Sequence, residues 1–171
     1  VQYAFIGSDK SGNEISVEEL VYPQQKIPIE SSRIHGIYDD DVKGLSSFSS
    51  HVEKIEELVN GAVIVGHNVR RFDLPFLGNE YSRSGSLVPK PVAVIDTLEL
   101  ARRLKLPRPH NLGALCSRYG IDLTNAHTAS ADAAATLLLL WKLMCDHPQP
   151  FRQSIDEIER WLQGTSTIRS A

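Results

Sequence analysis

The chain has 171 residues, of which 42% are hydrophobic and 23% are charged, and its formal net charge is -3 at pH 7. This length suits one domain with a real core, and the charge excludes a globally basic protein that grips duplex DNA by bulk electrostatics. Any contact with nucleic acid must therefore be local.

Two cysteines are too few for a disulfide framework, and no CxxC or HxxxH pair is present to build a zinc site. No apolar run is long enough to cross a membrane, and no signal peptide is visible. We therefore expect a cytoplasmic protein with reduced cysteines and no membrane partner.

The first half of the chain reads mainly as strands. Residues 1–23 predict two strands around the turn SDKSGN, because apolar and β-branched residues flank it. Apolar residues at helical spacing then predict a helix over 48–59. The near-continuous apolar runs AVIVGH (62–67) and PVAVIDT (91–97) are typical of strands that are buried on both faces in a parallel sheet.

Helices dominate the rest. A short helix is expected over 72–85, with Pro75 tolerated in its first turn, and Phe72, Phe76 and Leu77 share a face that can bury. Further helices are predicted over 98–105, 111–121, 129–147 and 154–162. A strand pair followed by strands that alternate with helices predicts an α/β fold, with a mixed sheet and helices on its faces.

Basic residues gather in the middle of the chain. They are Arg70, Arg71, Arg83, Lys90, Arg102, Arg103, Lys105 and Arg108. A solvated surface explains most of them, so by themselves they do not identify a ligand.

Two acidic residues stand at predicted helix starts. Asp73 alone is explained by the helix dipole, which favours a negative charge in the first turn. The segment HTASAD (127–132) changes this interpretation, because it places His127 just before the long helix and Asp132 in its first turn. A carboxylate that binds a divalent cation, with a neutral imidazole nearby to accept a proton, suits metal-assisted hydrolysis.

These segments resemble a known family. HNVRRFDLPFL (67–77) is similar to the second motif of the DEDDh 3′–5′ exonucleases, and HTASAD (127–132) is similar to the third. The family includes the proofreading subunit of bacterial DNA polymerase III. Three further segments agree with the family in their order and spacing. They are RIHGIYDDDV, VIDTLELARRL and HNLGALCSRYGIDL. The resemblance covers residues 1–146, which leaves 147–171 as a C-terminal helix and tail.

The resemblance implies an RNase H-like fold with a mixed five-stranded sheet flanked by helices, and a two-metal site for Mg²⁺ or Mn²⁺. It implies that Asp73 and Asp132 are metal ligands and that His127 is the general base. Asp96 has no metal role in the family and is expected to be structural. Ile34, His35 and Gly36 are implied to lie near the 3′-terminal nucleotide and Asn68 beside the site. Phe72 is expected to bind substrate with them.

The first motif of the family, D-x-E, is absent from the 171 residues. In the family it lies on the first and central strand, just before a strand that resembles VQYAFIG. The nearest substitute, DEIE (156–159), is expected to be a solvated helix face. We expect a short preceding segment to carry D-x-E. The alternatives are a strand supplied by another chain or domain, and a degenerate relative without activity.

The function that the resemblance implies is metal-dependent 3′–5′ exonuclease activity, which releases 5′-mononucleotides from single-stranded or frayed nucleic acid, with DNA favoured over RNA. The implied partners are a 3′-terminal nucleic acid and a DNA polymerase or a repair protein. The alternative is a catalytically impaired module that binds nucleic-acid ends or associates with a polymerase. A hydrolase for another substrate has no support, since no phosphate-binding glycine loop is present.

Overall fold

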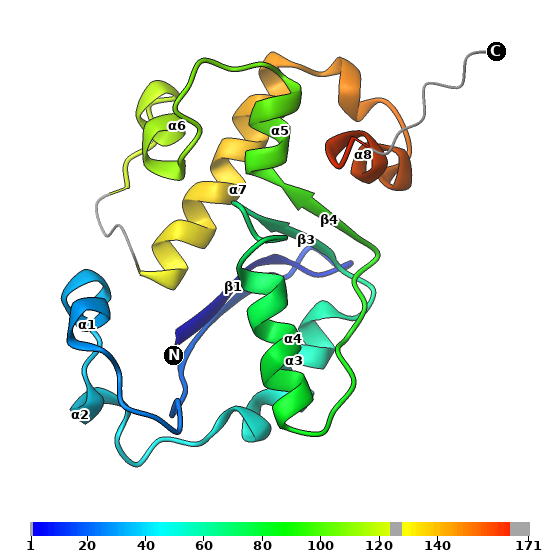
Figure 1. The fold of residues 1–171 in the computed structure, drawn as a ribbon. Coiled ribbons are helices and arrows are strands. Elements are labelled where there is room, and N and C mark those ends of the chain that lie inside the picture. The colour runs from blue at the N-terminus through cyan, green and yellow to red at the C-terminus, as the bar shows by residue number, and fades with distance from the viewer. Residues whose placement is uncertain (1, 124–127, 165–171) are drawn as a thin grey trace.

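A computed structural model describes residues 2–123 and 128–164 of the chain (Figure 1). Its strands are β1 (Gln2–Ser8), β2 (Glu14–Leu20), β3 (Val63–Gly66) and β4 (Ala93–Asp96). Its α-helices are α1 (Ile29–His35), α2 (Asp39–Val42), α3 (Val52–Val59), α4 (Asp73–Arg83), α5 (Thr97–Arg103), α6 (Leu112–Arg118), α7 (Ala129–Asp146) and α8 (Ile155–Leu162), and the short 3₁₀ helices are η1 (Phe48–His51) and η2 (Gln149–Phe151).

The first two strands form the predicted hairpin. They pair antiparallel, from Gln2 opposite Leu20 to Ser8 opposite Glu14. The turn is closed by Asp9, whose carboxylate accepts hydrogen bonds from the backbone N–H groups of Ser11 and Asn13. An aspartate that bonds the backbone just after itself is a common way to build a tight turn.

The other two strands run parallel, from Val63 opposite Ala93 to Gly66 opposite Asp96. β4 is buried at every position, as predicted. The prediction that β3 is buried on both faces is wrong, because Val63 is 45% exposed and its neighbours are only half-buried. Among the described residues β3 pairs with β4 alone, so its other edge has no strand to cover it.

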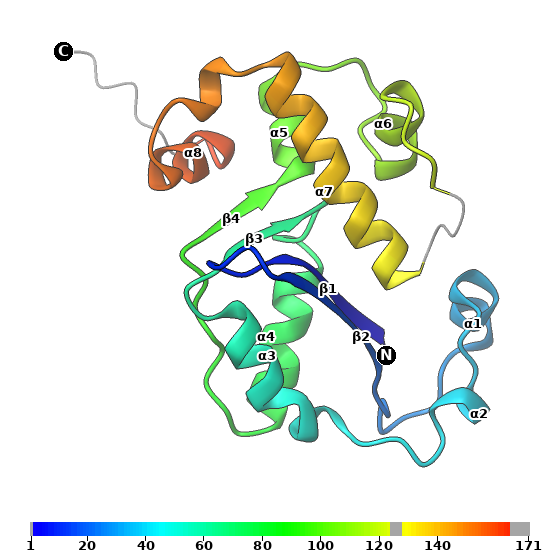
Figure 2. The same cartoon turned by 180° about the vertical axis from the view of Figure 1, so that it is seen from behind.

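The outer edge of β4 is closed by α8 (Figure 2). The N–H of Val94 donates a 2.6 Å hydrogen bond to Oε2 of Glu159, and Ile158 and Leu162 are buried in the core beside it. The expectation that DEIE (156–159) is a solvated face is therefore wrong for Glu159. A backbone N–H at the edge of a sheet needs an acceptor, and here a helix side chain supplies it.

Helix α7 packs against both strand pairs. It packs against β1, β2 and β3 on one side and against α5 and α6 on the other. Its residues Leu139 and Leu143 are fully buried in a cluster with Leu100 of α5 and Leu115 of α6. A second cluster lies under α3 and α4, where the buried Tyr81 hydroxyl donates to the carbonyl oxygen of Val52.

The observed architecture confirms the predicted mixed α/β fold with helices on the faces of the strands. The described strands form two pairs instead of one continuous sheet, and the division falls between β1 and β3. The resemblance implies a first strand in the centre of the sheet, with neighbours on both sides. Within the described ranges, no helix combines the length and the apolar character needed to cross a bilayer. Cys116 and Cys145 are free thiols, as expected.

Candidate active site

Asp73 begins α4, directly after a tight turn at the end of β3. The turn folds back on the strand so closely that a Cβ atom on Gly66 would lie 2.6 Å from Cβ of Val69. Asn68 adopts a left-handed backbone conformation with φ 58°. The close approach requires a glycine at 66, and an asparagine tolerates the conformation at 68 better than most residues do.

The carboxylate of Asp96 holds this turn in place. Its Oδ1 accepts from the N–H groups of Asn68 and Leu98 at 2.9 Å and of Glu99 at 3.4 Å, and its Oδ2 accepts from the N–H of Arg70 at 3.2 Å. Asp96 is only 1% exposed. One buried carboxylate therefore caps α5 and fixes the turn before Asp73, in agreement with the structural role expected for it.

Asp132 lies in the first turn of α7 and is close enough to Asp73 for their charges to interact. The pKa of Asp73 is raised, first because the surrounding protein partly removes its carboxylate from water, and then because the negative charges of Asp96 and Asp132 oppose its ionisation. Asp73 as a residue remains exposed, so solvent limits this effect. The structure thus brings together two predicted metal ligands that are far apart in the sequence.

The predicted general base, His127, lies outside the described residues. The residues that follow it are described. Thr128 is the N-cap of α7, and the N–H of Ala129 donates a 3.4 Å hydrogen bond to Oε1 of Gln2 on β1. The first turn of α7, which carries Asp132, is thereby tied to β1.

Two aromatic rings beside Asp73 face solvent. Phe72 is 58% exposed and Phe76 is 45% exposed, so the prediction that they share a buried face with Leu77 is wrong for both. Leu77 does pack against the core under α4, because it lies on the same helix face as the buried Tyr81, four residues further on. Exposed aromatic rings next to a pair of carboxylates offer a surface on which bases can stack.

The remaining predicted substrate residues lie on and after α1. Ile34 is 66% exposed, Nδ1 of His35 accepts from the N–H of Ile37, and Gly36 ends the helix in a left-handed conformation with φ 73°. Figures 1 and 2 show α1 toward the N-terminal end of α7. Termination of α1 is sufficient to explain the glycine, and a substrate role for these residues stays a prediction.

Sequence reasoning missed His67, at the end of β3. Its Nε2 lies 2.9 Å from the carbonyl oxygen of His110, and its Nδ1 lies 2.8 Å from Oγ1 of Thr97. Since a carbonyl can only accept, Nε2 carries a proton. Burial lowers the pKa of His67, and the hydrogen bond to the carbonyl of His110 and the negative charge of Asp96 offset this only in part. The signal in the sequence was a histidine that ends an apolar strand, a position that contributes little to a core.

The donor chemistry of the site fits a hard divalent cation in part. Asp73 and Asp132 supply carboxylate oxygens, the ligands that Mg²⁺ and Mn²⁺ prefer, while Asp96 is fully used by backbone donors. Across residues 2–123 and 128–164, no group of three or more histidine, cysteine, aspartate or glutamate side chains could hold a metal ion. Two carboxylates by themselves are too few for the two-metal site that the resemblance implies, and their role as metal ligands stays a prediction.

Comparison with known proteins identifies the family. The family model described as "Exonuclease" matches residues 3–140. The DNA polymerase III PolC-type of Lacticaseibacillus paracasei is 39% identical over 127 residues, which are 74% of this chain and 9% of that protein. The same polymerase of Halalkalibacterium halodurans is 34% identical over 130 residues, 75% of this chain and 9% of that protein. The chain thus spans about a tenth of the length of these relatives.

Solved structures share the fold. Exonuclease X in complex with 5′ overhanging duplex DNA has a TM-score of 0.67 and 20% identity, with 95% of this chain and 90% of that chain covered. E. coli Exonuclease I in complex with a dA16 oligonucleotide has a TM-score of 0.72 and 22% identity, with 86% of this chain and 37% of that chain covered. The chain belongs to the exonuclease family, as its resemblance to the DEDDh 3′–5′ exonucleases indicated.

Proposed function

We propose that this chain is the catalytic domain of a metal-dependent 3′–5′ exonuclease that removes 5′-mononucleotides from single-stranded or frayed DNA ends. The observation that carries the proposal is the electrostatic interaction between Asp73 and Asp132. These carboxylates come from separate helices, and they lie close enough for the charge of Asp132 to raise the pKa of Asp73. Two like charges held together in this way are stabilised by a cation between them.

Each residue then has a defined role. Asp73 and Asp132 would hold Mg²⁺ or Mn²⁺, and such ions, when bound, lower the pKa of water and offset the charge of the phosphate. His127 would accept the proton of the attacking water, since a neutral imidazole is available at physiological pH. The exposed ring of Phe72 would stack against a terminal base, and Ile34, His35, Gly36 and Asn68 would complete the binding surface.

The remaining carboxylates would come from a D-x-E strand between β1 and β3. Among the described strands, β1 pairs with β2 alone and β3 pairs with β4 alone, while α7 packs against both β1 and β3. A strand placed there would use the free edges of both pairs and would cover the exposed Val63. It would bring its acidic residues to the same end of the strands as Asp73.

The proposed substrate and setting follow from the relatives. The solved structures are complexes of Exonuclease I with an oligonucleotide and of Exonuclease X with an overhanging duplex. These complexes favour a DNA end as the substrate of this chain. The PolC-type relatives favour a DNA polymerase as partner. The free thiols of Cys116 and Cys145 support a reducing compartment, and we place the protein in the cytoplasm.

The test is cleavage of a 5′-labelled single-stranded oligonucleotide by the full-length protein in Mn²⁺ or Mg²⁺. Products should shorten one nucleotide at a time from the 3′ end. Asp73→Asn and Asp132→Asn should each reduce kcat by about 100- to 1,000-fold, because each removes several kcal/mol of metal-assisted stabilisation. His127→Ala should reduce kcat by a factor of about 10² or more. Asp122→Asn, an exposed carboxylate, is the matched control and should leave kcat unchanged.

A second candidate function is a module that binds nucleic-acid ends without turnover. One observation favours it: in the part of the chain that the structure describes, no three histidine, cysteine, aspartate or glutamate side chains are grouped so that they could hold a metal ion. A full-length protein that binds single-stranded DNA but leaves both DNA and RNA intact in either metal would support this module. The same result would rule out the exonuclease.

A further inference from the structure

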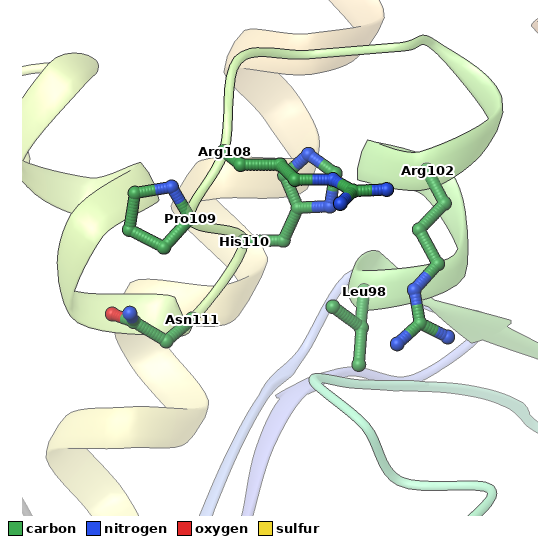
Figure 3. Close-up of a pocket in the computed structure, with 6 residues that line it drawn as sticks. All are labelled: Leu98, Arg102, Arg108, Pro109, His110 and Asn111. Atoms are coloured by element: carbon green, nitrogen blue, oxygen red, sulfur yellow. The ribbon is translucent and has the colours of Figure 1, made fainter.

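A basic cavity lies between α5 and the loop before α6. It has a volume of about 920 Å³ and is lined by Leu98, Arg102, Arg108, Pro109, His110 and Asn111. Figure 3 shows the side chain of Arg108 extending from the loop across the opening, toward the helix that carries Leu98 and Arg102. None of the described residues that line this cavity is acidic, and its volume is in the range of known ligand sites, roughly 300–1,000 Å³.

Within residues 2–123 and 128–164, the two arginines of the cavity have no counter-ion. Among the described residues, neither Arg102 nor Arg108 forms a side-chain hydrogen bond or an ion pair, whereas Arg70 and Arg83 both pair with glutamates. Oδ1 of Asn111 accepts from the N–H of Ala114, which leaves the amide nitrogen as a further donor. A cavity that presents cationic donors and no acceptor carboxylate is complementary to an anion.

The loop that carries Arg108 is fixed by its own hydrogen bonds. The guanidinium of Arg118 donates to the carbonyl oxygens of Pro107 and Pro109. Nε2 of His110 lies 2.7 Å from the carbonyl oxygen of Leu106, which closes the loop on itself. Arg108 is therefore presented to the cavity by an ordered backbone, and less entropy is lost when a ligand binds.

The cavity is connected to the active site through His67. This residue ends β3, just before the turn that leads to Asp73, and its ring is bonded to the carbonyl oxygen of His110 and to the hydroxyl of Thr97. His110 lines the cavity, and Thr97 begins α5, the helix that supplies Leu98 and Arg102. The basic cavity and the carboxylates thus lie at the same end of the strands.

We propose that the cavity formed by Arg102, Arg108, His110 and Asn111 binds backbone phosphates of the single strand, upstream of the nucleotide that is cleaved. This inference rests on the proposed function and names a substrate contact for it. Arginine guanidinium groups bind phosphate oxygens in a bidentate manner, and Leu98 and Pro109 add apolar lining to the cavity. A local basic site of this kind also explains how a chain with net charge -3 holds a polyanion.

The test compares a long and a short substrate on the full-length protein. The long one is an oligo(dT) of about 12 nucleotides, a typical site length for single-strand binding, and the short one is a dinucleotide, which has no upstream phosphates. Arg102→Ala and Arg108→Ala should each raise KM for the long substrate about tenfold, with kcat unchanged, and should leave KM for the dinucleotide unaltered. Arg103→Ala, which removes a charge from the same helix but does not line the cavity, is the control.

Salt dependence gives a second readout. A double variant combines Arg102→Ala and Arg108→Ala. Its slope of log Kd against log salt concentration should become smaller in magnitude by about 1.4, since each phosphate contact with a single strand contributes about 0.7. Inorganic phosphate and 5′-dTMP are tested as competitors in the same assay, because a free anion offers the same chemistry as the backbone.

The outcomes separate this inference from the proposed function. A wild-type protein that cleaves DNA, with arginine variants that match it on both substrates, would overturn the inference and leave the exonuclease intact. Equal loss on the long substrate and the dinucleotide, or arginine-dependent binding of free phosphate without any length effect, would also overturn it. A wild-type protein that cleaves neither substrate would overturn both proposals together.

Discussion

Removal of the Asp96 carboxylate should be among the most destabilising changes in the chain. Its oxygens accept from four backbone N–H groups, two in the first turn of α5 and two in the turn before Asp73. Loss of a helix cap costs about 1 kcal/mol. Each of the other two donors, left without an acceptor, costs about 1–3 kcal/mol. Relief of a buried charge offsets part of this sum. We expect Asp96→Ala to lower the free energy of unfolding by about 3–5 kcal/mol.

Asp96→Asn provides a graded comparison. Its amide oxygen can still accept from the N–H groups of Asn68, Leu98 and Glu99, but its NH₂ group then faces the N–H of Arg70, donor against donor. We expect a loss of about 2 kcal/mol, from one unsatisfied pair and weaker bonds to an uncharged acceptor.

Urea unfolding followed by tryptophan fluorescence measures both variants. Trp161 packs against the main core cluster and reports its loss. With a typical m-value of about 2 kcal/mol/M, the midpoint should fall by roughly 2 M for Asp96→Ala and about 1 M for Asp96→Asn. The exposed Asp122→Ala should stay within about 0.5 kcal/mol of wild type. A loss below 1 kcal/mol for Asp96→Ala, or an equal loss for both Asp96 variants, would refute the role assigned to this carboxylate.

Two further predictions concern stability. The pKa of His67 is lowered in the folded protein, so below about pH 6.5 the unfolded chain takes up a proton at this residue before the folded protein does. The stability of the fold is therefore present above this pH and is lost as the pH falls below it. Urea midpoints between pH 7.5 and 5.5 should show this fall, and an undiminished fall in His67→Gln would contradict it. Glu159→Ala should cost about 1–3 kcal/mol, because it leaves the N–H of Val94 without an acceptor. The exposed Glu157→Ala is its control, and an equal effect of the two changes on thermal unfolding would show that Glu159 does not hold the strand edge.

The sequence by itself determined most of the elements, though not α1 and α2, and it predicted the two metal ligands. The turn SDKSGN, the apolar runs before Gly66 and Asp96, and the helical spacing after Asp132 each depend on neighbours within a few residues, so local periodicity predicts them. Membership of the exonuclease family could likewise be expected, because short motifs around Asp73 and Asp132 carry it.

Only the tertiary structure decided which surfaces those elements present. An apolar pattern cannot say whether a partner covers it, and therefore the exposure of Val63 and of Phe72 was not predicted. The hydrogen bond between Val94 and Glu159 joins residues that are 65 positions apart in the sequence. The bond between His67 and His110 joins residues that are 43 positions apart. Such contacts form where the packed helices and strands place the side chains, and no local spacing records them. The basic cavity of Arg102 and Arg108 arises for the same reason, because a helix and a loop create it only when they fold together.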